Sequence, residues 1–388
     1  MKLTHFHIFM IGWAYYLGGP VIVAYLGLLN RVESAGAWVY YIQKIGTEHG
    51  LLILYVALMP AAYFIGDKLS QQFKRARPRV NYVRLANWLM WPAYAFLLVV
   101  LTVSARELLF AGYAKGYDLY LMGPIATLQM LILFQYLLYK SSGNRAAAKL
   151  NAYLLIATSV ILLGMGGRLY VVTSLAAIYF YYWNWGSKNA TSRRNSLIAM
   201  FAFLIMLAAI GMWRMGEANL IQLGFYLFAE PLFTSISAFS FMQNWEMVLF
   251  DAPKDFFFAF LNIVPSWIWE DKAEYFSELL TEKIGVLSPF GALSIVASSA
   301  GNFGFIGGLL FIMLVGFIMG RSRLNAVSPI SRALYCYLTG LLLFIFFRDP
   351  FQIQVKLVLT GFLLALFYQS ISAFSAPTTR RQPTLRPN

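Results

Sequence analysis

Arg168 stands at an unusual place in the sequence, directly between two apolar runs. Residues 150–166 precede it, residues 169–186 follow it, and Gly167 is its N-terminal neighbour. Glycine permits a tight turn and lets another group approach the backbone closely, while a guanidinium group binds phosphate oxygens through two parallel hydrogen bonds. We therefore predict a hairpin with Arg168 at its tip, acting as a phosphate ligand in binding and in catalysis.

Four more cations lie at or near the ends of apolar runs, where inserting a charge into the membrane is energetically unfavourable. At membrane depth it costs roughly 2.5–3.5 kcal/mol on insertion scales, so such a side chain usually faces a cavity or a partner. Grouped with Arg168, these cations would suit the pyrophosphate of a lipid headgroup; they are Arg106, Arg214, Arg348 and Lys356. Arg106 and Arg348 each precede an acid, so an ion pair is the alternative for both. Lys356 can instead extend to the lipid surface, and Arg214 can be an ordinary charge at a helix end.

Glu230 is the acidic residue that we predict to act as a general base. It interrupts the apolar stretch 218–239, where burial would raise the pKa of its carboxyl group and suit it to proton transfer. The sequence holds no P-loop, no HExxH and no Cys/His spacing typical of a metal site. The histidines all lie in the first 50 residues and are not predicted to be catalytic. We therefore expect neither a metal nor a cofactor.

The composition indicates that a helical membrane protein carries these residues. Hydrophobic residues make up 60% of the 388 residues and charged residues only 12%, whereas soluble domains carry about 25% charged residues. Several runs of about 18 to 22 residues are nearly free of charge and long enough to cross the bilayer as helices. We predict one all-α, polytopic transmembrane domain over residues 1–388 with about ten spans, roughly at 8–29, 50–66, 85–104, 118–139, 150–166, 169–186, 196–213, 302–320, 333–347 and 351–371.

The charges between these spans alternate sharply and predict the orientation. One set of connections holds most of the 30 cations and a single acid, Asp67. The cations of this set lie at Lys2, from Lys68 to Arg84, from Lys140 to Lys149, from Lys188 to Arg194, from Arg321 to Arg332, and in the basic tail 373–388. The positive-inside rule places this set, with both termini, in the cytoplasm, and the first apolar run is then an uncleaved span. The net charge of +14 therefore mainly reflects the orientation in the membrane, and the basic connections would also attract anionic lipid. We expect membrane lipid, and no nucleic acid, as a partner.

Residues 214–301 break the pattern of short connections, and we predict a large outer loop there. Two apolar stretches within it, 218–239 and 256–269, are not ordinary spans, because Glu230 and Pro231 interrupt the first and the second is too short. Both either dip into the membrane as a re-entrant pair or lie on its outer surface, and nearby tryptophans suit the interface. Long connections of this kind are often functional.

Two stretches carry a resemblance to a known family: 164-GMGGRLYVV-172, and residues 286–320, where a small-residue turn and Asn-Phe-Gly lead into a glycine-rich helix. With the arrangement of spans, central hairpin and late loop, they resemble bacterial O-antigen polymerases of the Wzy type. The resemblance implies a glycosyltransferase of the inner membrane, with the large loop in the periplasm. Such an enzyme joins undecaprenyl-pyrophosphate-linked oligosaccharides into O-antigen or a related surface polysaccharide. It also implies Arg168 as a pyrophosphate ligand and leaves open a chain-length regulator as a protein partner.

Three other functions stay open. One is an acyltransferase, against which the missing intramembrane histidine counts. An O-antigen ligase is a related transferase that uses a histidine in its large outer loop, and residues 214–301 contain none. A flippase or transporter of lipid-linked glycan would be marked by an internal repeat or by a charged path at mid-membrane, and neither is visible in the sequence. The polymerase is therefore the function that we predict.

Overall fold

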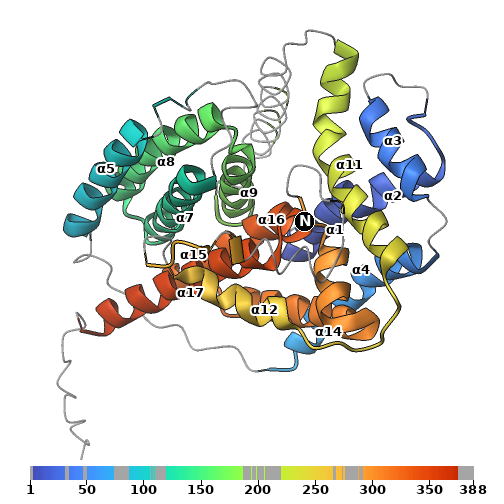
Figure 1. Ribbon diagram of the computed structural model, residues 1–388. Helices are drawn as coiled ribbons and strands as arrows, with labels where there is room; N and C mark the ends of the chain where they lie inside the picture. Colours follow the sequence, from blue (N-terminus) through green and yellow to red (C-terminus); the bar gives the residue numbers. More distant parts are fainter. Residues whose placement is uncertain are drawn as a thin grey trace, which may run out of the picture.

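The computed structural model describes residues 3–30, 35–46, 50–73, 87–104, 119–186, 220–264 and 292–374, with a few short pieces between them. Every regular element within these ranges is a helix (Figure 1), which confirms the predicted all-α class. Six helices are long and apolar enough to cross a membrane: His5–Tyr25, Gly50–Ser70, Met122–Ser141, Arg145–Met165, Ile295–Leu324 and Phe351–Ile371. These helices indicate a membrane protein, as predicted.

The helices follow the chain in a simple order. The first long helix has three parts, which are α1 (His5–Trp13), the π-helical turn η1 (Ala14–Gly18) and α2 (Gly19–Tyr25). Then come α3 (Gly36–Ile45), α4 (Gly50–Ser70), α5 (Asn87–Ser104), α7 (Leu119–Ser141), α8 (Arg145–Met165) and α9 (Arg168–Trp185). The second half holds α11 (Leu220–Asn244), α12 (Lys254–Ala259), the 3-10 helix η3 (Phe260–Ile263), α14 (Ile295–Leu324), α15 (Pro329–Leu343), α16 (Ile345–Arg348) and α17 (Phe351–Phe374).

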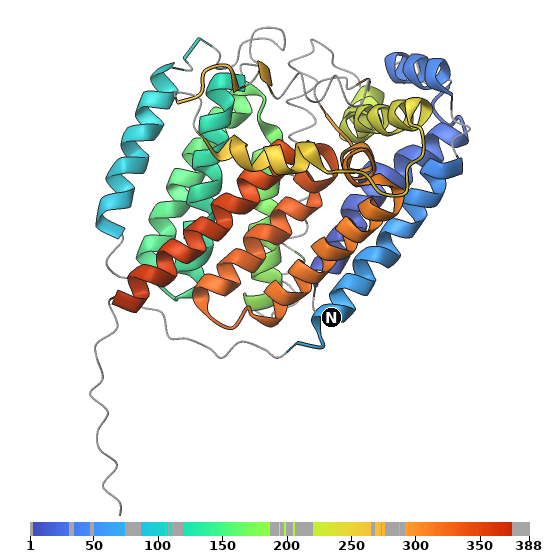
Figure 2. The same ribbon diagram turned by 60° about the horizontal axis from the view of Figure 1, so that its bottom comes forward.

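Glycines let two pairs of long helices pack with their backbones close together. α4 and α14 lie side by side (Figure 2), and a Cβ atom at Gly66 or Gly316 would overlap backbone atoms of the partner helix. α9 and α15 meet in the same way at Gly340, where a Cβ would lie 2.9 Å from the Thr173 carbonyl oxygen. Small residues at such contacts are typical of helix packing in membranes. The contacts fix the ends of these helices, which carry the charged residues described below.

Three helical segments, α11, α12 and η3, lie across one end of the bundle instead of running along its long helices (Figure 2). Phe257, Phe260 and Leu261 on α12 and η3 keep exposed side chains. An exposed apolar face suits a helix that lies at a membrane surface.

Four of the predicted spans are not among the six apolar helices. Three of them correspond to α5, α9 and α15, and the 15 residues of α15 are fewer than the about 20 needed to cross a bilayer. The fourth, at 196–213, lies almost entirely outside the described residues, as do Arg214 and residues 375–388 of the tail.

Candidate functional site

Arg348 is the centre of a charged cluster at the end of the bundle that α11 crosses. Its Nε lies 2.6 Å from Oε1 of Glu230, and its Nη1 donates a hydrogen bond to Oδ1 of Asp349 at 2.8 Å. The side chains are 18% exposed for Arg348, 35% for Glu230 and 2% for Asp349. We call these three residues the Arg348 cluster. It contains one accessible carboxylate, that of Glu230, and one buried carboxylate, that of Asp349.

The turn that carries Arg348 is held by helices from distant parts of the chain. Arg348 ends the short helix α16, and its carbonyl oxygen accepts a hydrogen bond from Leu293 N at 2.8 Å. The side-chain amide of Gln354, in α17, donates to the Asp349 carbonyl at 2.5 Å. On α1, Gly12 leaves room for the turn, because a Cβ there would lie 2.5 Å from the ring of the residue before Arg348. The backbone that carries Arg348 is therefore fixed by contacts with distant segments, and the two carboxylates hold its guanidinium group.

Glu230 reaches Arg348 because α11 crosses the end of the bundle. The Thr234 hydroxyl donates to the Glu230 carbonyl at 2.8 Å, and the Trp38 indole of α3 donates to the Leu232 carbonyl at 2.8 Å. These bonds hold the turn around Pro231, whose ring cannot donate a backbone hydrogen bond. We expected burial to govern the Glu230 carboxylate, but it stays 35% exposed and paired with Arg348. The carboxylate is therefore accessible and is paired with a positive charge.

Two tyrosines lie beside the cluster on a π-helical turn. Tyr15 and Tyr16 belong to η1, four to five residues before Pro20. Since Pro20 has no N–H for the Tyr16 carbonyl, the α-helical hydrogen-bond pattern is interrupted here. Both hydroxyls lie within electrostatic range of the Arg348 cluster, and Tyr15 also lies within range of Arg168. Turns of this type occur frequently at functional sites, and our sequence reasoning did not identify these tyrosines.

The predicted hairpin at Arg168 is confirmed. α8 ends at Met165, Gly166 adopts the left-handed conformation with φ 93° and ψ 5°, and the Gly167 N–H donates to the Leu162 carbonyl at 2.6 Å. Arg168 is the first residue of α9 and is half-buried. Its electrostatic interaction with Tyr15 places it on the same side of the molecule as the Arg348 cluster.

Three of the long helices that begin at this end of the bundle start beside the cluster or at Arg168. α9 starts with Arg168, α17 starts two residues after Asp349, and the N-terminal cap of α14 follows Leu293, which is bonded to the Arg348 carbonyl. A helix N-terminus carries a partial positive charge and unpaired N–H groups, which favour bound anions. The helix ends and the two arginines therefore create a positive field around two carboxylates.

Asp349 has the most perturbed carboxyl group of the cluster. Burial raises its pKa to about 6, although the adjacent Arg348 acts in the opposite direction. Its Oδ1 accepts from Arg348, while its buried Oδ2 has no hydrogen bond within the part of the chain that the structure describes. A group with this pKa changes its protonation near neutral pH. Protonation of Asp349 would remove one of the two negative charges that neutralise Arg348.

Two other predicted ligands, Lys356 and Arg106, do not join the cluster. Lys356 lies in α17 within electrostatic range of Lys272. The Lys272 ammonium donates to the Asn262 and Val264 carbonyls at 2.9 and 2.5 Å, and burial, with Lys356 nearby, lowers its pKa to about 8. The Arg106 side chain is 74% exposed, and its guanidinium group lies 3.7 Å from the Glu107 carboxylate. This is the ion pair that we named as the alternative to a role in binding pyrophosphate.

The Asn-Phe-Gly stretch has a structural role at the kink of α14. Gly304 has φ 79° and ψ 178°, and a Cβ there would lie 2.7 Å from backbone atoms of Leu249 and Phe250. Asn302 Oδ1 accepts a hydrogen bond from the Phe256 N–H at 3.2 Å. The stretch therefore anchors the segment that leads into α12 against the broken helix.

A second buried ion-pair cluster lies at the opposite end of the bundle. Asp67 Oδ1 lies 2.9 Å from Nη2 of Arg323 and 3.3 Å from Nε2 of His5, while His5 Nδ1 and the Tyr63 hydroxyl are 2.8 Å apart. His5 is fully buried. The sequence contained a signal for this cluster, because Asp67 is the single acid among the predicted cytoplasmic connections.

No comparison assigns this chain to a family: family models, curated proteins and solved structures all give no match. Among the described residues, no group of three or more His, Cys, Asp and Glu side chains is placed to hold a metal ion. The functional argument therefore rests on the Arg348 cluster, the two tyrosines and Arg168.

Proposed function

We propose that this chain is a membrane glycosyltransferase that polymerises undecaprenyl-pyrophosphate-linked oligosaccharide repeat units into O-antigen or a related surface polysaccharide. The observation that carries the proposal is the convergence of Arg348, Arg168 and two carboxylates at one end of an apolar helical bundle. Arginines in this position suit a pyrophosphate that is anchored in the membrane by its own lipid. A nearby carboxylate suits the hydroxyl that attacks.

In the proposed reaction, the bond between C1 of the donor glycan and its pyrophosphate oxygen breaks, and the electron pair leaves with the pyrophosphate. A new bond forms between C1 and a hydroxyl oxygen of the incoming unit, whose proton passes to a carboxylate. Arg168 and Arg348 stabilise the charge that develops on the departing pyrophosphate. The positive ends of α9, α14 and α17 add to this stabilisation.

Glu230 is the carboxylate that we propose as general base, because its side chain is 35% exposed and a substrate can reach it. Asp349, at 2% exposure, instead holds and partly neutralises Arg348. A pyrophosphate that binds Arg348 would compete with Glu230 for the guanidinium group. This exchange would release Glu230 to accept the proton at the moment when the substrate is in place.

The proposed topology has about ten spans, with α5, α9, α15 and residues 196–213 added to the six apolar helices. Both termini would then lie in the cytoplasm, and the Arg348 cluster would face the periplasm from the inner membrane. The sorting of charges supports this orientation, because Arg323, Arg332 and Lys140 all lie at the end opposite Arg348. Donor and acceptor lipids would reach the cluster from the outer leaflet, and a chain-length regulator remains a candidate partner.

A gel of surface glycan from cells that lack the gene tests the function. Collapse of the ladder to a single repeat unit on its acceptor supports a polymerase, because export and attachment still work. Loss of attached glycan with long lipid-linked chains would indicate a ligase, and single units trapped inside would indicate a flippase. An unchanged ladder would refute all three functions. Complementation with Arg348→Gln or Arg168→Gln, checked for equal protein in the membrane, then tests the assigned residues.

A further inference from the structure

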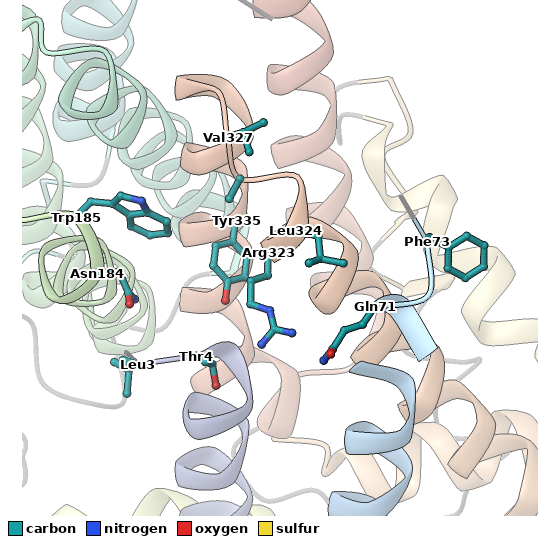
Figure 3. Close-up of a pocket in the computed structure, with 11 residues that line it drawn as sticks. Leu3, Thr4, Gln71, Phe73, Asn184, Trp185, Arg323, Leu324, Val327 and Tyr335 are labelled. Atoms are coloured by element: carbon teal, nitrogen blue, oxygen red, sulfur yellow. The ribbon is translucent and has the colours of Figure 1, made fainter. Parts of the chain in front are cut away.

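A cavity of about 550 Å³ opens at the end of the bundle opposite the Arg348 cluster (Figure 3). Its volume is within the range of small-ligand sites, about 300 to 1,000 Å³. Polar side chains from five segments line it, namely Thr4, Gln71, Asn184, Arg323 and Tyr335, and apolar residues complete the wall. Convergence of polar groups from distant segments on one apolar cavity is typical of a binding site.

Arg323 provides the charge of this cavity. Its guanidinium group has five N–H donors. The contact with Asp67 uses only Nη2, which lies 2.9 Å from Oδ1 of the carboxylate. The side chain remains 28% exposed, and in Figure 3 it projects into the space that Thr4 and Gln71 also face. Asp67 therefore fixes the arginine in place and leaves part of its donor surface directed at the cavity.

Two further arginines increase the positive charge around the cavity. Arg321 lies 5.5 Å from the ring centre of Phe73, and Arg332 lies 5.5 Å from the ring centre of Trp185. Both rings belong to the cavity wall. Asp67 is engaged by Arg323 and His5.

The neutral groups of the wall are hydrogen-bond donors as well. The Tyr335 hydroxyl accepts from the His5 backbone N–H at 3.3 Å, so its own proton points elsewhere. The side-chain amide of Gln71 offers further donors, and Asn184 keeps a second amide N–H besides the one that donates to the Phe180 carbonyl at 3.1 Å. The Thr4 hydroxyl is bonded to Nδ1 of His7 at 2.7 Å. An arginine surrounded by neutral donors is the arrangement that binds a phosphate ester.

We propose that this cavity binds a phosphate ester, supplied either by the headgroup of an anionic phospholipid or by a small soluble molecule. The phosphate would contact Arg323, and the carbon part of the ligand would lie against the apolar wall. This site is separate from the Arg348 cluster, so the proposal does not depend on the polymerase function.

Binding to the purified full-length protein in neutral detergent tests the proposal. Trp185 lines the cavity, so its fluorescence can report titrations with dioctanoyl phosphatidylglycerol and, separately, with glycerol 3-phosphate. We expect saturable binding of at least one probe, weakened roughly 10-fold or more by Arg323→Gln, since a charge-assisted bidentate contact is lost. Ala326→Trp should fill the cavity and weaken binding while leaving the Arg323–Asp67 pair intact. Arg145→Gln, an exposed charge change outside the cavity wall, should leave it unchanged.

The two probes distinguish the sources. Binding of phosphatidylglycerol alone assigns the site to lipid, whereas binding of glycerol 3-phosphate at similar concentration assigns it to a soluble ester. No saturable binding of either probe would overturn the proposal. Binding that is equal in the wild type and in the stably folded Ala326→Trp protein would overturn it as well.

Discussion

A partly buried arginine bound to carboxylate lies at each end of the bundle, Arg348 at one and Arg323 at the other, but the two arrangements differ in access and in charge. Arg348 contacts two carboxylates, and one of them, Glu230, is 35% exposed. Arg323 contacts one carboxylate, Asp67, which is 7% exposed and is shared with His5. Arg348 therefore has two carboxylate partners among the described residues, whereas Arg323 shares its one carboxylate partner with His5.

The difference indicates two uses of the same ion-pair chemistry. Asp67 joins α1, α4 and α14 through His5 and Arg323, so its loss would leave buried partners without a counter-charge. Glu230 lies at the surface and can give up Arg348 to an anionic ligand, because Asp349 still neutralises part of the charge. We therefore expect changes at the Asp67 end to act mainly on stability, and changes at the Arg348 end to act mainly on chain growth.

The largest effect expected is on chain growth, from Arg168→Ala and Arg348→Ala. Each change removes a cation that would stabilise the departing pyrophosphate, and loss of one such group costs roughly 100-fold in rate. Chain length on a glycan gel, normalised to protein in the membrane, measures this. Arg145→Ala is the matched control for Arg168, because each arginine is the first residue of a long helix. Normal glycan ladders from both Arg168→Ala and Arg348→Ala would refute the roles assigned to these two arginines.

The next largest effect is on stability, from Asp67→Ala. This change leaves His5 and Arg323 without their carboxylate, and we expect a loss of about 2 to 4 kcal/mol in the free energy of unfolding. Glu230→Gln should cost less than about 1 kcal/mol, because its carboxylate is partly exposed. Thermal unfolding of the two variants in the same detergent makes the comparison. Equal destabilisation would contradict the distinction between the two ends.

Local features of the functional end were predictable from the sequence, and its tertiary contacts were not. The turn at Gly166 and Arg168 follows from the conformational freedom of glycine between two apolar runs, a property that local sequence encodes. Glu230 and Arg348 were each selected for their chemistry, but they are 118 positions apart in the sequence. Their contact depends on α11 crossing the bundle, which hydrophobicity alone does not specify.

The residues that sequence reasoning missed have a common physical cause. Tyr15, Tyr16 and His5 lie within an apolar run, where aromatic side chains are ordinarily packing residues. Their neighbours come from distant helices, so no spacing along the chain marks them. Asp67 was visible as an exception to the charge pattern, and such an exception in a basic connection is a usable signal for a buried ion pair.

A smaller effect concerns the pH dependence that Asp349 contributes. Its folded-state pKa of about 6 lies above the unfolded value of about 3.9, so the folded protein binds the proton more tightly. The free energy of unfolding should therefore rise as the pH falls from about 7 to about 4, by at most about 2 kcal/mol. Asp349→Asn should lack this part of the slope, while Glu246→Gln, outside the cluster, should keep it. Identical slopes in the wild type and Asp349→Asn would show that burial does not perturb this carboxyl group.

The smallest effect concerns Lys356, which we predicted as a pyrophosphate ligand and which lies near Lys272. Burial lowers the pKa of Lys272 to about 8, below the unfolded value of about 10.4. Above pH 8 the Lys272 amine therefore loses its proton in the folded protein but keeps it in the unfolded chain. Stability should then rise by about 1 kcal/mol between pH 8 and pH 9 relative to Lys272→Met. Lys356→Gln removes the neighbouring positive charge and should move the onset of this rise to higher pH, whereas Arg348→Gln should not. If Arg348→Gln moved it equally, the cations at this end would form a single electrostatic unit, and Lys356 would belong with Arg348 after all.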